Sequence, residues 1–151
     1  VGIENSEIKK FNVNDGAGVA LLRQSGIKLA LISGRKSNAT ALRASELRID
    51  DVYNGTLNKI PPYEELKLKY DLTDSEIAYV GDDLIDIPVM QKVGVPIATQ
   101  NASVPCKNAA VHVTKASGGE GAFREAVEWI LAKQGRLEEV IEDLRNKVLS
   151  P

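Results

Sequence analysis

The stretch IAYVGDDLIDIPVM, residues 77–90, joins an apolar run to a group of carboxylates. Its start, 77–80, predicts a short buried strand that ends at Gly81. Asp82, Asp83 and Asp86 follow directly. Ligands of parallel α/β sheets bind beyond the carboxyl ends of the strands. If the chain forms such a sheet, the three aspartates lie where a site belongs.

The rest of the chain alternates apolar strands with amphipathic helices. Strands are expected at 8–13, 27–32, 52–53, 95–98 and 111–113 in addition to 77–80, and helices at 14–26, 37–47, 61–70, 89–92 and 121–132. Asn14 and Asp15 are the expected caps of the first helix, and Gly26 its end. This alternation predicts an α/β fold, a three-layer Rossmann-like parallel sheet with helices on both faces.

We expect one domain over 1–133 and a separate amphipathic helical tail over 134–151. In the tail, apolar residues fall on one helical face: Leu137, Val140, Ile141, Leu144 and Val148. This face either docks on its own domain or packs between subunits.

Composition excludes several functional classes. The 151 residues carry a net charge of −2, so no basic surplus indicates nucleic acid as a main partner. No apolar run approaches the roughly 18 residues that would cross a bilayer. Cys106 is the only cysteine, which excludes an intrachain disulfide and fits a reducing cytoplasm. We interpret it as a small buried or partly exposed thiol.

Two further strand ends carry polar residues. Ser33, Gly34 and Arg35 come after strand 27–32 and before a helix, where a hydroxyl and free N–H groups favour phosphate. Ser33 alternatively serves only as the helix cap. Lys59 either neutralises the same phosphate or is a solvated surface charge.

The aspartates themselves favour a metal. Neighbouring carboxylates repel unless a cation compensates, and Mg²⁺ binds through one or two carboxylates and several waters. We therefore predict Asp82 as a metal ligand, whereas Asp86, two residues before Pro88, also suits a helix N-cap. The segment 118–121 is either a flexible turn or a loop that closes over substrate, and we interpret His112 as a strand residue rather than a catalyst.

The order of these features resembles a known superfamily. A serine after one strand, then a lysine, then Gly-Asp-Asp-x-x-Asp after another strand is similar to motifs two, three and four of the haloacid dehalogenase superfamily. The stretches KFNVNDG (10–16), SGRKS (33–37) and GGEGAFRE (118–125) resemble the 3-deoxy-D-manno-octulosonate 8-phosphate phosphatase family. The resemblance covers about residues 7–133.

The resemblance implies a small, capless, tetrameric phosphatase that needs Mg²⁺ and acts on the phosphate ester of an eight-carbon keto sugar acid. It implies that Ser33 and Lys59 hold the phosphate and that Asp82 ligates the metal. Asp83 and Asp86 would orient metal-bound water or nearby side chains. The expected contacts to the sugar acid are Gly34, Arg35, Gly118 and Gly119.

The family's first motif, Asp-x-Asp-Gly, is absent from this sequence. In the family its first aspartate attacks phosphorus and its second is the acid/base. Asp15-Gly16 matches a different family stretch. We expect about twenty to thirty residues before Val1, carrying this motif on a strand at the centre of the sheet. The sequence would then start inside a β-hairpin, with 6–13 as its second strand.

Two other protein classes share some of these features. The same fold occurs as a non-catalytic assembly domain in some sialic acid activating enzymes. A phosphoacceptor receiver domain also uses aspartates, a serine or threonine and a lysine, but there the acidic pair comes first and the lysine last. The sequence also leaves eight-carbon and nine-carbon substrates open.

Overall fold

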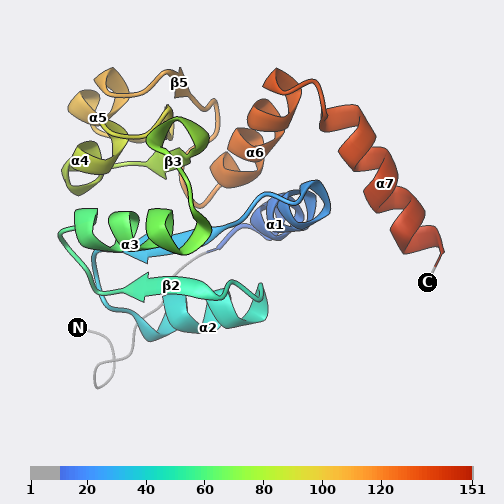
Figure 1. Cartoon of the computed structure of the whole chain (residues 1–151), viewed down its shortest axis with the longest axis horizontal. Coiled ribbons are helices and arrows are strands. Elements are labelled where there is room, and N and C mark those ends of the chain that lie inside the picture. The colour runs from blue at the N-terminus through green and yellow to red at the C-terminus, as the bar shows by residue number, and fades with distance from the viewer. Residues whose placement is uncertain (1–10, 151) are drawn as a thin grey trace.

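The computed structural model describes residues 11–150, and these form alternating strands and helices (Figure 1). The strands are β1 (Ala30–Ser33), β2 (Asp51–Asn54), β3 (Ala78–Gly81), β4 (Val95–Ala98) and β5 (His112–Val113). The helices are α1 (Val13–Ser25), α2 (Asn38–Glu46), α3 (Ile60–Tyr70), α4 (Ile87–Met90), α5 (Val104–Asn108), α6 (Ala122–Lys133) and α7 (Leu137–Leu149). Two single-turn 3₁₀ helices, η2 (Asp74–Glu76) and η3 (Leu84–Asp86), complete the order. The predicted α/β class is confirmed.

The strands pair in parallel, in two groups. β1 pairs with β2, with Ala30 opposite Asp51, and β3, β4 and β5 form a three-stranded sheet in that order. Within the described part of the chain, no ladder joins β1 to β3. The carboxyl ends of β3 and β4 lie level, since Gly81 is opposite Ala98.

The start of the chain differs from the prediction. Residues 1–10, which hold most of the expected strand 8–13 and hairpin strand 6–13, lie outside the described residues. Residues 11–12 are not in a strand, and Val13 begins α1. Asn12, rather than Asn14 or Asp15, caps this helix, because its backbone is extended and its side chain accepts from the Asn14 N–H. Gly26 ends α1 with a φ of 80°, as predicted.

Several other helix and strand boundaries differ from those predicted from the sequence. β1 begins at Ala30 rather than 27, α4 begins at Ile87 rather than 89, and α5 was not expected at all. Ser33 does not cap α2. That role belongs to Ser37, whose hydroxyl oxygen accepts from the Thr40 N–H at 3.2 Å. Ser33 therefore does not serve as the helix cap.

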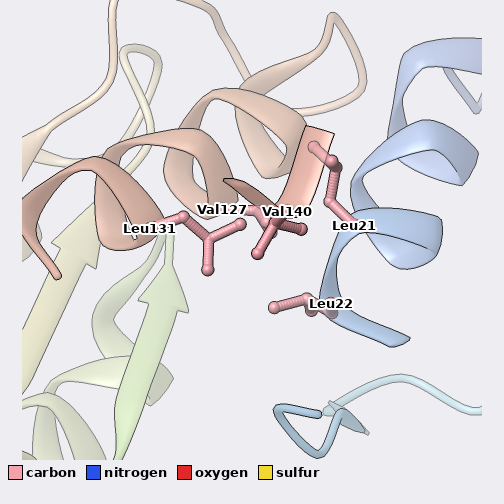
Figure 2. Close-up of a cluster of buried hydrophobic side chains, with 5 residues drawn as sticks. All are labelled: Leu21, Leu22, Val127, Leu131 and Val140. Atoms are coloured by element: carbon pink, nitrogen blue, oxygen red, sulfur yellow. The ribbon is translucent and has the colours of Figure 1, made fainter. Parts of the chain in front are cut away.

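The tail docks on its own domain. Val140 of α7 is 3 % exposed and packs among Leu21 and Leu22 of α1 and Val127 and Leu131 of α6 (Figure 2). Figure 1 shows α7 running outward beside α1 and α6 at the end of the molecule away from β2. Each fully buried Val or Leu side chain contributes about 1.5–3 kcal/mol. Leu137, Val140 and Leu144 of the predicted apolar face therefore pack on the chain's own domain, whereas Ile141 and Val148 are exposed.

Candidate active site

Asp86, in η3, is the most highly connected side chain of the site. One carboxylate oxygen, Oδ1, accepts from Lys59 Nζ at 2.6 Å and from the Tyr79 hydroxyl. The other, Oδ2, accepts from the backbone N–H groups of Asp82 at 2.9 Å and Asp83 at 3.2 Å. Asp86 occupies the N-cap position of α4, as predicted, but its side chain makes no capping hydrogen bond to that helix. With four donors already bound, this carboxylate organises its neighbours and is not free to ligate a metal.

The charge of Asp86 is set by opposing effects. Burial acts to raise the pKa of its carboxyl, but the hydrogen bonds from Lys59 and Tyr79 outweigh burial and hold the pKa below its ordinary value. Burial, followed by the nearby Asp86 charge, raises the pKa of the Tyr79 hydroxyl well above its usual range. Tyr79 therefore stays a donor, and Asp86 stays an anion, across neutral pH.

Lys59 is not a solvated surface lysine. It is 7 % exposed and precedes α3, on the segment that follows β2, while its partner Asp86 follows β3. The ion pair therefore links the two sheets at the carboxyl ends of their strands. An ammonium group has three N–H donors, so the bond to Asp86 leaves donors for a ligand.

Asp82 and Asp83 lie at the exposed rim beside this pair, with different roles. Asp83 accepts from the Leu84 N–H at 2.7 Å and caps η3. The protein around Asp82 displaces enough water to raise the pKa of its carboxyl, and the charge of Asp86 raises it further. A divalent cation would relieve this cost. Over residues 11–150, no three His, Cys, Asp or Glu side chains converge on a metal position. The exposed carboxylate of Asp82 could supply one oxygen ligand.

The Ser33 loop is held at the same edge. The carbonyl oxygen of Ser33 accepts from Gly55 N at 2.9 Å and Thr56 N at 2.8 Å, and the positive φ of Gly55 allows this turn. Its hydroxyl donates to the Arg35 carbonyl at 2.9 Å, while Arg35 itself is exposed. Asn54, at the end of β2, binds both the N–H and the carbonyl of Ser37. Asn54 was not identified from the sequence, although its polar side chain at a strand end was the available signal.

Gly34 shows how closely this loop meets the aspartate segment. A Cβ at this position would lie 2.6 Å from Ile85 Cδ1 and 3.4 Å from Leu57 Cδ2. The close approach brings the segment after β1 against η3, which follows β3. The structure thus gathers Ser33, Lys59 and Asp82, three residues predicted separately, at one edge.

The Gly118–Gly119 segment reaches this region by a different route. Gly118 N donates to Asn101 Oδ1 at 2.9 Å, and Asn101 lies in the segment after β4. The same segment bonds to the aspartates, because Ser103 N donates to the Asp82 carbonyl at 3.0 Å. Asn101 was not identified from the sequence, since a lone asparagine in a loop gives no signal.

Two residues to which the sequence analysis gave no catalytic role, His112 and Cys106, lie outside the site. His112 is in β5 and stacks on Trp129 with ring centroids 4.3 Å apart, as a strand residue would. Cys106 is buried against Met90, and burial raises the pKa of its thiol to about 11. The prediction of a small thiol is confirmed in its buried form.

Comparison with known proteins identifies the family. Residues 37–124, more than half of the chain, match the family of haloacid dehalogenase-like hydrolases. The 3-deoxy-D-manno-octulosonate 8-phosphate phosphatase KdsC of Escherichia coli K12 is 40% identical over 139 residues, which cover 92% of this chain and 74% of the relative. The chain belongs to the 3-deoxy-D-manno-octulosonate 8-phosphate phosphatase family. It is an enzyme, a phosphoric monoester hydrolase.

Solved structures of this family agree with the fold of the phosphatase. The enzyme of Moraxella catarrhalis, in complex with magnesium, phosphate and KDO, has a TM-score of 0.87 and 37% identity, over 92% of this chain and 80% of that chain. The cobalt-bound enzyme of Haemophilus influenzae has a TM-score of 0.82 and 37% identity, over 87% and 77%. Within residues 11–150 of the phosphatase, no helix has the length and apolar character to cross a membrane.

Proposed function

We propose that this phosphatase hydrolyses 3-deoxy-D-manno-octulosonate 8-phosphate and requires Mg²⁺. The observation that carries the proposal is the buried Lys59–Asp86 pair, 2.6 Å between Nζ and Oδ1. Asp86 also accepts from the Asp82 N–H, and Ile85 beside it meets Gly34 of the Ser33 loop. A buried ammonium group with unused N–H donors and an exposed carboxylate at the same edge suit a phosphate monoester with a divalent metal. The relatives named above act on this sugar acid phosphate, which supports the choice of substrate.

In this proposal Ser33 and Lys59 bind the phosphate. The unused N–H donors of Lys59 and the rotatable hydroxyl of Ser33 supply hydrogen bonds to phosphate oxygens. Gly34 lacks a side chain, which lets the backbone of the loop come close to the ligand. Asp86 holds the ammonium group in place, so its role is to position Lys59 rather than to touch substrate.

Asp82 would hold the metal, with Asp83 fixing the backbone beside it. Mg²⁺ bound there would offset negative charge on the phosphate and the nearby carboxylates. The magnesium and phosphate in the Moraxella relative, and the cobalt in the Haemophilus relative, support a role for a divalent ion.

The nucleophile is a separate part of the proposal. Asp86 already accepts four hydrogen bonds and Asp83 caps η3, so neither suits attack on phosphorus. We propose that the nucleophile and the acid/base are the two aspartates of the family's Asp-x-Asp motif. Its first carboxylate bonds to phosphorus as the sugar alkoxide leaves, and its second protonates that alkoxide. Water then cleaves the aspartyl-phosphate and releases inorganic phosphate.

The sugar acid would contact Arg35 and the Gly118–Gly119 segment. Arg35 is exposed at the mouth of the Ser33 loop, and its guanidinium suits a carboxylate. The likeness of 10–16, 33–37 and 118–125 to the family supports these assignments. The same likeness leads us to propose a cytoplasmic homotetramer as the working form.

A phosphate-release assay tests the proposal. The full-length protein is incubated with Mg²⁺ and 3-deoxy-D-manno-octulosonate 8-phosphate, and inorganic phosphate is measured with and without a chelator. We expect release that stops on chelation and in Asp82→Asn. A folded, Mg²⁺-loaded protein that releases none would favour the alternative of a non-catalytic assembly domain. Release from nine-carbon acid phosphates alone would change the substrate.

A further inference from the structure

The segment after β5, residues 114–118, is fastened by two side chains outside the proposed phosphate and metal site. Asn101 holds one end, because its Oδ1 accepts from Gly118 N at 2.9 Å and from Thr99 Oγ1 at 2.8 Å. Thr99 is 6 % exposed and itself bonds through its N–H to the Gly81 carbonyl at 3.2 Å. Gly118 is thus tied, through Asn101, to the buried ends of β4 and β3.

Glu125 holds the other end. From the first turn of α6 its two carboxylate oxygens accept from Lys115 N at 2.7 Å and Ala116 N at 2.9 Å. Hydrogen bonds of backbone N–H groups to a carboxylate are among the stronger ones in proteins. The Ala116 carbonyl meanwhile accepts from Gln100 N at 3.2 Å. The segment is therefore bound on two sides, by α6 and by the segment after β4.

This arrangement is more than a loop needs in order to connect a strand to a helix. The segment 99–103 bonds to the loop through Asn101 and to the Asp82 carbonyl through Ser103 N, at 3.0 Å. It therefore relates the position of Gly118 to the position of the proposed metal ligand. Gly118 and Gly119 have no side chains that could orient the segment themselves, so its geometry depends on Asn101 and Glu125.

We infer that Asn101 and Glu125 are positioning residues that hold the Gly118–Gly119 segment where it recognises the sugar acid part of the substrate. They act on specificity rather than on phosphate transfer, because neither bonds to Ser33, Lys59 or Asp86 in the described structure. The inference rests on the proposed function and adds the residues that set its specificity.

The test compares two esters on the full-length Mg²⁺-loaded protein: 3-deoxy-D-manno-octulosonate 8-phosphate and phenyl phosphate, which has no sugar acid. In Asn101→Ala and Glu125→Gln we expect KM for the sugar acid phosphate to rise about two- to tenfold, the range of one lost hydrogen bond. The ratio of kcat/KM for the sugar acid phosphate to that for phenyl phosphate falls by the same factor.

Matched variants separate positioning from general damage. Glu128→Gln alters a carboxylate one turn further along α6 that pairs with Arg124 at 2.9 Å, so the substrate ratio should stay constant. Asn101→Asp retains an acceptor oxygen for Gly118 and should restore much of the ratio. Amide hydrogen exchange gives a readout without turnover: Gly118 should exchange faster in Asn101→Ala, and Ala116 in Glu125→Gln.

The outcomes are distinguishable. An unchanged substrate ratio, or an equal loss on both esters, in correctly folded variants would overturn the inference. A wild-type protein that releases phosphate from phenyl phosphate but not from the sugar acid phosphate would overturn the proposed substrate and the inference with it. A wild-type protein inactive on both would overturn the proposed function as a whole.

Discussion

Lys59 and Asp86 form a buried ion pair that joins two parts of the chain 27 residues apart, with Nζ 2.6 Å from Oδ1. Lys59 is 7 % and Asp86 is 3 % exposed. Removing one partner of such a pair leaves an uncompensated buried charge, which costs more than the pair itself contributes. The stability of this edge and the position of the proposed phosphate-binding lysine therefore depend on the same contact.

Lys59→Met should lower the free energy of unfolding by about 3–5 kcal/mol at pH 7, because Asp86 stays buried without its cation. Urea denaturation followed by circular dichroism measures the change. Lys115→Met, at an exposed lysine, is the control and should stay within about 0.5 kcal/mol of wild type. Equal stability of the two variants would show that Asp86 does not depend on Lys59.

Tyr79→Phe keeps the ring and removes only the hydroxyl that donates to Asp86. We expect a loss of about 1.5–3 kcal/mol, the net contribution of one hydrogen bond to a charged group. The effect should not add to that of Lys59→Met, since both act on Asp86 Oδ1. A double-mutant cycle in urea tests this coupling, and strict additivity would contradict a shared carboxylate oxygen.

Asp51 predicts a pH dependence away from the site. Burial acts to raise the pKa of its carboxyl, but hydrogen bonds from Lys69 and Tyr70 hold the pKa below the ordinary 3.8. The unfolded state therefore takes up a proton first as the pH falls. The stabilisation is complete well above pH 3.8 and is lost as the pH falls through the lower folded-state pKa.

Asp51→Asn should accordingly cost about 1–3 kcal/mol at pH 7, and much less at a pH below the folded-state pKa. Urea midpoints of wild type and variant at several pH values measure the difference. Asp50→Asn, at the neighbouring exposed carboxyl, serves as the control. A difference between wild type and Asp51→Asn that stays constant with pH would refute the role of the charge.

Gly94 and Gly34 both lie close to neighbouring atoms, but we expect an added methyl group to affect mainly stability at Gly94 and mainly phosphate binding at Gly34. At Gly94 an added Cβ would lie 2.7 Å from the Ser75 carbonyl oxygen, which is backbone and cannot move aside, so Gly94→Ala should cost about 1–3 kcal/mol. At Gly34 the nearest atom is the end of the Ile85 side chain, which is 39 % exposed and can turn away. Gly34→Ala should therefore fold with a loss under about 1 kcal/mol.

The same Gly34→Ala protein should bind phosphate more weakly, because the added methyl group occupies space beside the Ser33 loop. Inhibition by inorganic phosphate measures this affinity. Wild-type affinity in a folded Gly34→Ala protein would argue against phosphate binding at this loop.

The docking of α7 can be tested at Val140. Val140→Asp places a charge in the cluster of Leu21, Leu22, Val127 and Leu131 and should lower the free energy of unfolding by roughly 3 kcal/mol. Val148 lies on the same helix but is 72 % exposed, so Val148→Asp should change it by less than about 0.5 kcal/mol. Similar losses in both variants would mean that the outer part of α7 also packs against something.

Much of the fold could be predicted because its signals are local. Gly26 in the left-handed region and the apolar run before Gly81 each mark an element within a few residues. The predicted helix caps were wrong where a nearby residue could also cap the helix. Asn12 caps α1 in place of Asn14 or Asp15, and Ser37 caps α2 in place of Ser33. The short α5 carried too few residues for a periodic pattern to appear.

The sequence by itself determined the alternation of strands and helices and the order serine, lysine, aspartates that marks the family. Tertiary structure alone decided what each aspartate does. Asp82, Asp83 and Asp86 have the same side chain and lie within one short stretch, but Asp86 is buried where Lys59 and Tyr79 reach it, while Asp82 remains at the rim. Burial and the number of donors that arrive from distant segments fix the charge and the free oxygens of a carboxylate. Neither quantity is encoded locally. For the same reason, the contacts that Asn101 and Glu125 make with the Gly118–Gly119 segment could be recognised only in the tertiary structure.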